Sequence, residues 1–354
     1  MPPLFRALLL PCLLLLLAAC TARPGPEVLT PHPGALSSAA EDAQVIRIYA
    51  ATNRALAAGF EGQPAFATSY RYYDISVPPG RAQGRITYPG ATPDPETDYL
   101  VTASGVLDRA AFLAETRGAG GPQRDLALYV HGYNTSFQEA LFRLAQISAE
   151  AHERVAPVLF SWPSRGKALD YESDRQAALF SRNALRDLVT GLTAGNRPLV
   201  VFGHSMGGFL VVETLRDLKL AGQAQVLAQL DVVLAAPDID LFVFASQLET
   251  LGPLPRPILV LTSQGDRALG LSSRLAGGRP RLGAVPAASP MVGAAARRAG
   301  VQIIDISSVQ ADPLGHQRYI GMVELYARAE AEPPELRVPG AFIFDALSRS
   351  LEAQ

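Results

Sequence analysis

Cysteine is nearly absent from this chain, which has only Cys12 and Cys20 among its 354 residues. Cys12 falls in an apolar leader, so Cys20 is expected to be the single cysteine of the mature protein. One cysteine forms no intramolecular disulfide, and neither Cys-x-x-Cys nor His-Glu-x-x-His occurs. We therefore expect no disulfide framework and no metal site, and the fold has to be stabilised by an ordinary apolar core.

Excess charge of one sign is missing too, because the formal net charge is −2. Loss of Arg6 with the leader makes it −3, which gives no strong field for nucleic acid or anionic lipid. No glycine-rich phosphate or dinucleotide loop is present, so we expect no cofactor. With 48% hydrophobic and 18% charged residues, the chain can build one large α/β domain.

The N-terminal apolar run, residues 7–17, is too short to span a bilayer and has the layout of a signal peptide. The run leads into Leu17-Ala18-Ala19-Cys20, which resembles a bacterial lipobox. Residues 1–19 are therefore predicted to be a lipoprotein signal peptide, with Cys20 acylated and anchored to a membrane. The alternative is an ordinary secretory signal in which Cys20 is incidental. Thr21, in place of an aspartate, favours the outer membrane facing the periplasm over the inner membrane.

The Pro-, Ala- and Ser-rich residues 20–42 are predicted to be a flexible tether, followed by a domain over residues 43–354. Further strands and helices alternate from residue 126 onward, which predicts a mostly parallel, doubly wound α/β sheet flanked by helices. Residues 78–99 are predicted to be loops and residues 277–300 a mobile loop. The predicted strands cover residues 45–49, 70–77, 126–130, 155–161, 199–203, 230–235, 257–262 and 301–306, and the predicted helices cover residues 136–152, 173–192, 207–219 and 240–250.

A Gly-x-Ser-x-Gly motif, Gly203-His204-Ser205-Met206-Gly207, ends the strand predicted for residues 199–203. An amphipathic segment follows it, so the motif has the strand-turn-helix context of a nucleophile elbow. The small residues on either side allow the serine a strained backbone, and the helix N-terminus favours a developing oxyanion. Ser205 is therefore predicted to be the nucleophile.

A serine nucleophile needs a base and an acid, and both follow the serine in the chain when it lies on a nucleophile elbow. Of the five histidines only His316 comes after Ser205, in a loop just past the last predicted strand. The acid should lie at the carboxyl end of a strand. Asp266 does so and is preferred, although a helix N-cap is its structural alternative. Asp238 and Asp240, which follow the preceding strand, stay open as competitors.

The oxyanion hole is expected to use two backbone N–H groups, those of Met206 and Tyr133. Tyr133 follows His131-Gly132 directly after the strand predicted for residues 126–130, and the glycine lets the backbone approach the substrate. His131 is expected to be a structural hydrogen-bonding residue. His204 is expected to shape the elbow.

The motifs together resemble a bacterial α/β-hydrolase family of unknown function, whose members are usually labelled esterase/lipase-superfamily proteins. They are Ala51-Thr52-Asn53-Arg54, the segment from Val130 to Phe137, Phe160-Ser161-Trp162-Pro163-Ser164, Asp174-Arg175, the elbow, Ala236-Pro237-Asp238-Ile239-Asp240 and Gly265-Asp266-Arg267-Ala268-Leu269. The resemblance runs from about residue 46 to at least His316. It implies an α/β-hydrolase fold and a Ser205, Asp266 and His316 triad, and it supplies no substrate.

The sequence thus predicts a membrane-anchored serine hydrolase, with a carboxylic ester of a small molecule or lipid as substrate and an acyl-enzyme intermediate. Two alternatives remain. The same chemistry could serve an acyltransferase, thioesterase or amidase acting on envelope lipid or glycan. The fold could also be reused by a non-catalytic binding protein of the envelope.

Overall fold

The computed structural model of the protein describes residues 23–34, 44–55, 62–81, 84–119, 125–151, 155–309 and 312–321. The predicted signal peptide and Cys20 lie outside these residues. The strands are β1 Gln44–Arg54, β2 Pro64–Val77, β3 Leu100–Leu107, β4 Asp125–Val130, β5 Val155–Ser161, β6 Leu199–His204, β7 Leu230–Ala235, β8 Ile258–Thr262 and β9 Val301–Asp305. The helices are η1 Pro26–Leu29, α2 Arg109–Ala119, α3 Phe137–Glu150, α4 Tyr171–Phe180, α5 Arg182–Leu192, α6 Met206–Leu220, α7 Ala224–Leu227, α8 Leu241–Leu251, α9 Arg267–Leu275, η3 Leu282–Ala284 and α10 Pro290–Arg298.

The described strands form a single sheet in the order β3-β2-β1-β5-β4-β6-β7-β8-β9. β1, β2 and β3 pair antiparallel with one another, and every pair from β1·β5 through β8·β9 is parallel. The predicted mostly parallel α/β-hydrolase sheet is thus confirmed. In such a sheet the carboxyl ends of the parallel strands share one edge, which is where ligands bind. We call this the catalytic edge.

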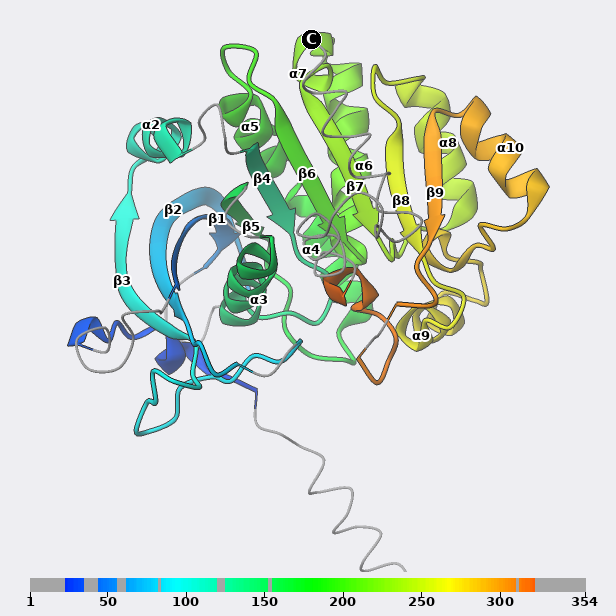
Figure 1. Ribbon diagram of the computed structural model, residues 1–354. Helices are drawn as coiled ribbons and strands as arrows, with labels where there is room; N and C mark the ends of the chain where they lie inside the picture. Colours follow the sequence, from blue (N-terminus) through cyan, green and yellow to red (C-terminus); the bar gives the residue numbers. More distant parts are fainter. Residues whose placement is uncertain are drawn as a thin grey trace, which may run out of the picture.

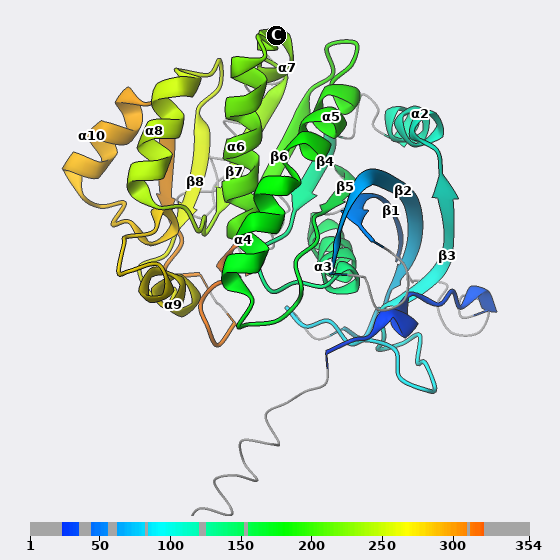
Figure 2. The same ribbon diagram turned by 180° about the vertical axis from the view of Figure 1, so that it is seen from behind.

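Helices lie on both faces of the sheet. α3 packs on one face, over β1 and β5 (Figure 1). α4, α5, α6, α8 and α10 cover the opposite face (Figure 2). α6 lies at the centre of that layer, where it contacts α5, α8 and β6.

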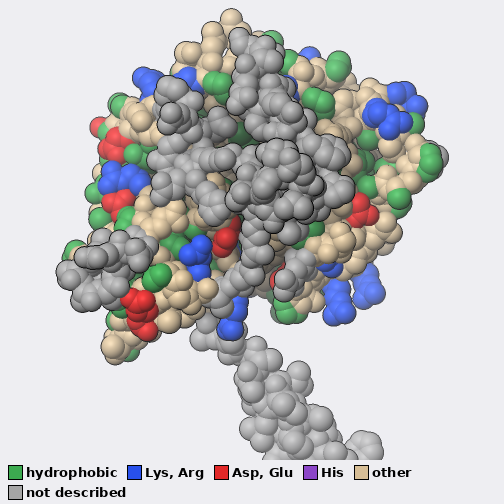
Figure 3. Space-filling model, viewed as in Figure 1, with side chains coloured by type: hydrophobic (Ala, Val, Ile, Leu, Met, Phe, Trp, Pro, Cys, Tyr) green, Lys and Arg blue, Asp and Glu red, His purple; other side chains and the backbone are tan. Residues whose placement is uncertain are grey.

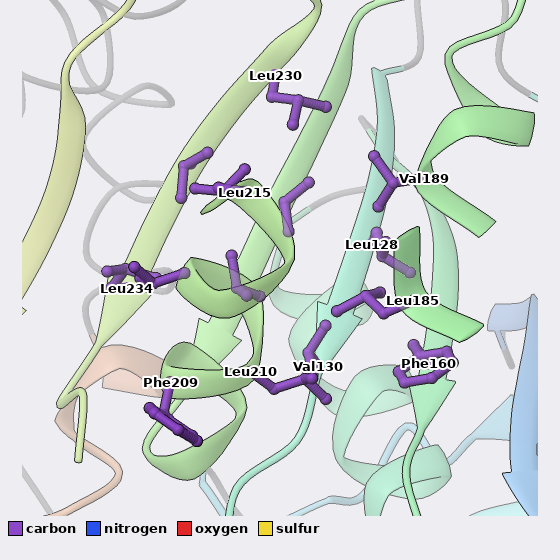
Figure 4. Packing of buried hydrophobic residues seen from close by; sticks show 14 of the residues in the cluster. Leu128, Val130, Phe160, Leu185, Val189, Phe209, Leu210, Leu215, Leu230 and Leu234 are labelled. Atoms are coloured by element: carbon purple, nitrogen blue, oxygen red, sulfur yellow. The ribbon is translucent and has the colours of Figure 1, made fainter. Parts of the chain in front are cut away.

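The largest apolar core lies between the sheet and the helix layer that contains α6. Figure 4 shows Leu210 of α6 directed toward Val130 of β4, while Leu185 and Val189 of α5 lie beside Leu128 and Phe160. A second cluster, which includes Leu141 and Phe142, fills the space beneath α3. Because both faces are buried, the central strands are continuous apolar runs, as expected for parallel sheets.

Several helices begin at the catalytic edge on a capping side chain. Ser136 and Glu139 form a reciprocal capping box at the start of α3. Asp240 accepts hydrogen bonds from the backbone at the start of α8, and Asp266 does the same for α9. The cap residues therefore fix where the chain turns from strand to helix, on the edge that carries the predicted site.

The structure differs from the sequence predictions in several elements of the domain. β3 and α2 had not been predicted. The single helix predicted over residues 173–192 is two helices that meet at Ser181, whose hydroxyl donates to the Ala177 carbonyl and accepts from Asn53. The mobile loop predicted over residues 277–300 contains η3 and α10, and α10 starts with Pro290 after the Ser289 cap.

Residues 23–34, the described part of the predicted tether, contact the domain, and we call them the strap. Val28 is buried in the cluster beneath α3, and the His32 N–H donates to the Val101 carbonyl. The Arg23 guanidinium bonds to Glu139, to both oxygens of Asn134 and to the Gly166 carbonyl. Proline-rich composition suggested a free linker, but these tertiary contacts hold the strap on the domain.

The approach of α6 to β4 leads to a stability prediction. A Cβ on Gly207 would lie 2.3 Å from the Val130 carbonyl oxygen and 2.4 Å from that of His131. Gly207→Ala should therefore lower the free energy of unfolding by about 3 kcal/mol, since backbone atoms would have to move. Gly270→Ala is the matched control, because a Cβ there meets nothing within 4 Å. We expect it to be neutral or stabilising by up to about 1 kcal/mol in urea unfolding. Equal effects of the two substitutions would contradict this account.

Candidate active site

Ser205 lies at the turn between β6 and α6 with φ 54° and ψ −121°, a backbone that L-residues rarely adopt. Its N–H donates to the Ala235 carbonyl, and its own carbonyl accepts from Gly208 and Asp238. These three backbone hydrogen bonds hold the strained turn in place. Within the described residues the Ser205 hydroxyl makes no hydrogen bond, so it remains available to a base and a substrate.

His316 and Asp266, which are 50 residues apart in the chain, meet at the catalytic edge. The His316 Nδ1 lies 2.6 Å from Asp266 Oδ2, and the Asp266 side chain is fully buried. The other oxygen of Asp266 accepts from the Leu269 N–H as the α9 cap. Asp266 therefore both contacts His316 and caps α9, the two roles that the sequence had offered as alternatives. With Nδ1–H donating to Asp266, Nε2 of His316 is left with its lone pair free.

The competing carboxylates are held in other contacts. Asp238 accepts hydrogen bonds from Tyr171 and Ser272 and forms a buried ion pair with Arg281, at 3.2 Å. Asp240 caps α8 and also lies 3.6 Å from Arg279. The geometry brings Asp266, and neither of these two, to His316.

His204 connects the elbow to the histidine loop. Its ring centroid lies 4.7 Å from that of His316 and 4.8 Å from that of Tyr319. Burial holds the pKa of His204 well below its ordinary value, with a smaller contribution from His316. The neutral ring therefore donates from Nε2 to the His316 carbonyl, at 3.3 Å. His204 thus supports the position of His316 as well as shaping the elbow.

The loop that carries His316 is also held by Asp312, whose role the sequence analysis had missed. One carboxylate oxygen of Asp312 accepts from the backbone N–H groups of His316 and Gln317, each at 2.8 Å. The other accepts from the Leu314 N–H. The Asp-Pro-x-Gly sequence of this loop was the available signal, because aspartates often bond the backbone a few residues on.

The predicted oxyanion loop, residues 131–136, lies directly against the elbow. A Cβ on Gly132 would be 3.0 Å from Ser205 Cβ and 2.9 Å from His204 Nδ1, so only glycine fits at this spacing. The backbone N–H groups of Tyr133 and Met206 have no acceptor in the described part of the chain. The loop predicted to supply one oxyanion donor therefore lies against the elbow predicted to supply the other, and both N–H groups are unoccupied within the described residues.

Arg54, from the Ala-Thr-Asn-Arg segment, joins this loop to the loop after β5. Its buried guanidinium donates to the Ser164 and Thr135 carbonyls and to the Ser161 hydroxyl, and lies 3.2 Å from His131 Nε2. Burial lowers the pKa of Arg54, and the nearby Asp174 opposes this effect. Arg54 therefore cross-links the two loops from beneath, which no local sequence pattern had indicated.

Asp174 joins the same loops from the other side. It accepts hydrogen bonds from the Ser164 hydroxyl, at 2.5 Å, and from the N–H groups of Arg165 and Asn134. Burial raises its pKa, and these donors partly counteract that shift. In the same segment Arg165 forms an ion pair with Asp170, and Arg175 stacks on Phe209.

Two cavities lie near these elements. One of about 140 Å³ is lined mainly by polar residues and lies between the strap and His204, next to Gln317 and Tyr319. The other, about 600 Å³ and mainly apolar, lies between α8, α10 and β9 and is not lined by Ser205, Asp266 or His316. Among the described residues, no group of histidine, cysteine and acidic side chains could hold a metal ion.

His131 gives a pH-dependent prediction. Its ring is fully buried, stacks on Trp162 and donates from Nδ1 to the Gly132 carbonyl. Burial and the charge of Arg54 lower its pKa to about 3. Below about pH 6.5 the unfolded chain therefore binds a proton at His131 that the folded chain does not. The free energy of unfolding then decreases by about 1.4 kcal/mol for each unit by which the pH is lowered.

We expect His131→Asn to have a lower free energy of unfolding than the parent at pH 7. When the pH is lowered from 6.5 to 5, the free energy of unfolding of the variant should decrease by about 2 kcal/mol less than that of the parent. Urea unfolding at both pH values measures the difference. Parallel losses in parent and variant would mean that His131 is protonated in the folded state.

Comparison with known proteins agrees with this architecture. Residues 117–332 match the family described as alpha/beta hydrolase of unknown function (DUF900). The uncharacterized protein alr1448 of Nostoc sp. (strain PCC 7120) is 30% identical over 27% of this chain, which spans about a third (32%) of that relative's length.

Two solved structures are similar only at low identity. The alpha/beta hydrolase MGS-M1, from a Medee basin deep-sea metagenome library, is 13% identical with a TM-score of 0.30, over 80% of this chain and 92% of that one. A fungal esterase from Rhizomucor miehei is 14% identical with a TM-score of 0.31, over 80% and 83%. Likenesses this distant carry no argument about substrate. The family match, by contrast, covers more than half of the chain, and the protein belongs to the alpha/beta hydrolases of unknown function (DUF900).

Proposed function

We propose that this protein is a serine hydrolase of carboxylic esters that acts through Ser205, Asp266 and His316. The observation that carries the proposal is the 2.6 Å contact between His316 Nδ1 and Asp266 Oδ2, together with a serine of φ 54° whose neighbour His204 contacts His316. A carboxylate that holds Nδ1–H leaves Nε2 as the proton acceptor for a serine hydroxyl. The strained turn and the adjacent free N–H groups supply the two other requirements of acyl transfer.

In the proposed reaction, the Ser205 Oγ attacks the ester carbonyl carbon while its proton moves to His316 Nε2. The carbonyl oxygen becomes an oxyanion that accepts hydrogen bonds from the N–H groups of Met206 and Tyr133. Collapse breaks the bond to the leaving alcohol, which takes the proton from His316. Water then attacks the acyl-enzyme, gives a proton to His316 and releases the acid, and Ser205 recovers its proton.

Buried groups around the site favour this assignment of roles. The Asp266 carboxylate is fixed by the α9 cap, so it orients and stabilises a protonated His316 without moving. His204 stays neutral and His131 has a pKa of about 3, so neither competes as a base near neutral pH. His316 is therefore the histidine that we expect to exchange the proton.

The membrane anchor is part of the same proposal. The signal peptide and lipobox-like Cys20 favour an acylated protein in the cell envelope, on the periplasmic face of the outer membrane. In the described part of the chain no helix has the length and apolarity needed to cross a membrane.

Active-site labelling tests the nucleophile. We expect a fluorophosphonate probe to label the purified full-length chain at Ser205, because the probe reacts with an activated serine hydroxyl. Ser205→Ala and His316→Ala should lose the label while keeping the thermal unfolding transition of the parent. Peptide mapping after labelling identifies the modified residue. A folded parent that takes up no label would favour the non-catalytic binding protein.

Replacement of the acid tests the triad itself. Asp266→Asn should lower kcat on short p-nitrophenyl esters by about 10³- to 10⁴-fold, because His316 would lose the group that fixes its tautomer. Asp240→Asn is the matched control: it removes the charge of a capping carboxylate at the same edge, keeps an oxygen that can cap α8, and should change kcat less than tenfold. The reverse order of effects would transfer the acid role to the Asp238 and Asp240 segment.

A further inference from the structure

Large apolar side chains are exposed at the catalytic edge in loops and helices that follow four different strands. Leu169, at 97% exposed, follows β5, and Phe242, at 74%, follows β7. Leu271 and Leu275 lie on α9 after β8, and Leu314 lies in the loop after β9. We call these five residues the rim. Soluble surfaces scatter single leucines, but several large apolar side chains exposed at one edge of the sheet indicate a contact surface.

α9 contributes the most regular part of the rim. Its inward residues Leu269 and Ser272 are buried, whereas its outward positions include Leu271 and Leu275. Two arginines, Arg267 and Arg274, are exposed on the same helix, and its sequence from Arg267 to Leu275 contains no acidic residue. An outward face of leucine and arginine is typical of helices that lie in a membrane interface.

Cationic side chains extend beyond the helix itself. Arg279, at 61% side-chain exposure, follows α9, and Figure 3 shows Lys and Arg side chains at the lower right edge, in the region that α9 occupies in Figure 1. The whole protein is nearly neutral, so this is a local charge that would attract anionic headgroups only when the edge faces them.

The strap brings the N-terminal end of the described chain to this same edge. Arg23 bonds to Asn134, in the oxyanion loop, and to the Gly166 carbonyl, in the loop that leads to Leu169. Gln138, near the start of α3, donates to the Pro24 carbonyl at 2.6 Å. Cys20 precedes Arg23 by only three residues, which span at most about 11 Å. An acyl chain on Cys20 would therefore enter the membrane close to the catalytic edge.

We propose that the catalytic edge faces the bilayer, with the rim in the interface between headgroups and acyl chains, and that the substrate is an acyl ester lipid of that bilayer. The proposal rests on the function proposed above and on acylation of Cys20. The short connection at Arg23 sets the orientation, the rim leucines enter the interface, and Arg267 and Arg274 face anionic headgroups. A lipid ester then reaches Ser205 from the membrane side.

Site-specific fluorescence tests the contact without using activity. Leu271→Cys and, as control, Leu220→Cys are labelled with the fluorophore NBD in the full-length chain, which is reconstituted into phosphatidylethanolamine–phosphatidylglycerol vesicles. The unsubstituted chain, treated in parallel, reports labelling of the native cysteines. Leu220 is also exposed, at 61%, but it ends α6 at the opposite edge of the sheet.

We expect the fluorescence emission of the label at position 271 to shift to shorter wavelength and to be quenched by lipids brominated near the headgroup. The emission of the label at position 220 should keep the wavelength it has in water and should not be quenched. Arg267→Gln and Arg274→Gln should each reduce the population in contact about fivefold on anionic vesicles. Equal, unquenched signals at both positions would overturn the proposal. A blue shift at 271 without lipid quenching would indicate a protein partner or second copy and would overturn it as well.

Activity gives a second, separable readout. For Leu271→Ser/Leu275→Ser, the ratio of vesicle-embedded ester hydrolysis to p-nitrophenyl acetate hydrolysis should fall at least fivefold relative to Leu220→Ser. An unchanged ratio would contradict the docking proposal while leaving the hydrolase intact. A parent chain that hydrolyses neither ester would instead contradict the proposed function, and the quenching result would then decide the docking alone.

Discussion

The close approach of α6 to β4 is the constraint on which the site depends. Gly207 lies against the carbonyls of Val130 and His131 with no room for a methyl group. This spacing places the elbow, at Ser205, beside the loop that leaves β4, where a Cβ on Gly132 would lie 3.0 Å from that of Ser205. A larger residue would push the helix from the sheet and separate the proposed nucleophile, Ser205, from the proposed donor at Tyr133.

Around this contact, buried polar groups hold loops that carry no regular structure. Arg54 and Asp174 each bond to both the loop after β4 and the loop after β5. Burying such groups is costly in itself, and their several hydrogen bonds offset that cost only when every loop is in place. The arrangement therefore favours one loop geometry over its alternatives, which is what fixed oxyanion donors require.

The sequence predicted the sheet from β4 to β9 and the pairing of Asp266 with His316, because these depend on local patterns and chain order. Apolar runs mark the buried strands, and one histidine follows Ser205. The sequence preferred Asp266 as the partner of His316 but left Asp238 open, because both residues follow strands. The tertiary structure separates them, since Asp238 is held by Tyr171, Ser272 and Arg281. Whether the aligned residues catalyse a reaction stays a prediction.

The contacts of the strap could not be predicted from the sequence, for a related physical reason. Composition describes how a segment behaves alone, and residues 23–34 have the composition of a linker. One arginine with five hydrogen bonds and one buried valine are enough to hold such a segment on a surface that is already folded. Because Arg23 bonds to the loops beside the elbow, the chain enters the domain at the opening of the site. With an anchor at Cys20, a free linker of more than twenty residues would leave the orientation open. If Cys20 is acylated as proposed, a three-residue connection would instead hold the catalytic edge close to the membrane.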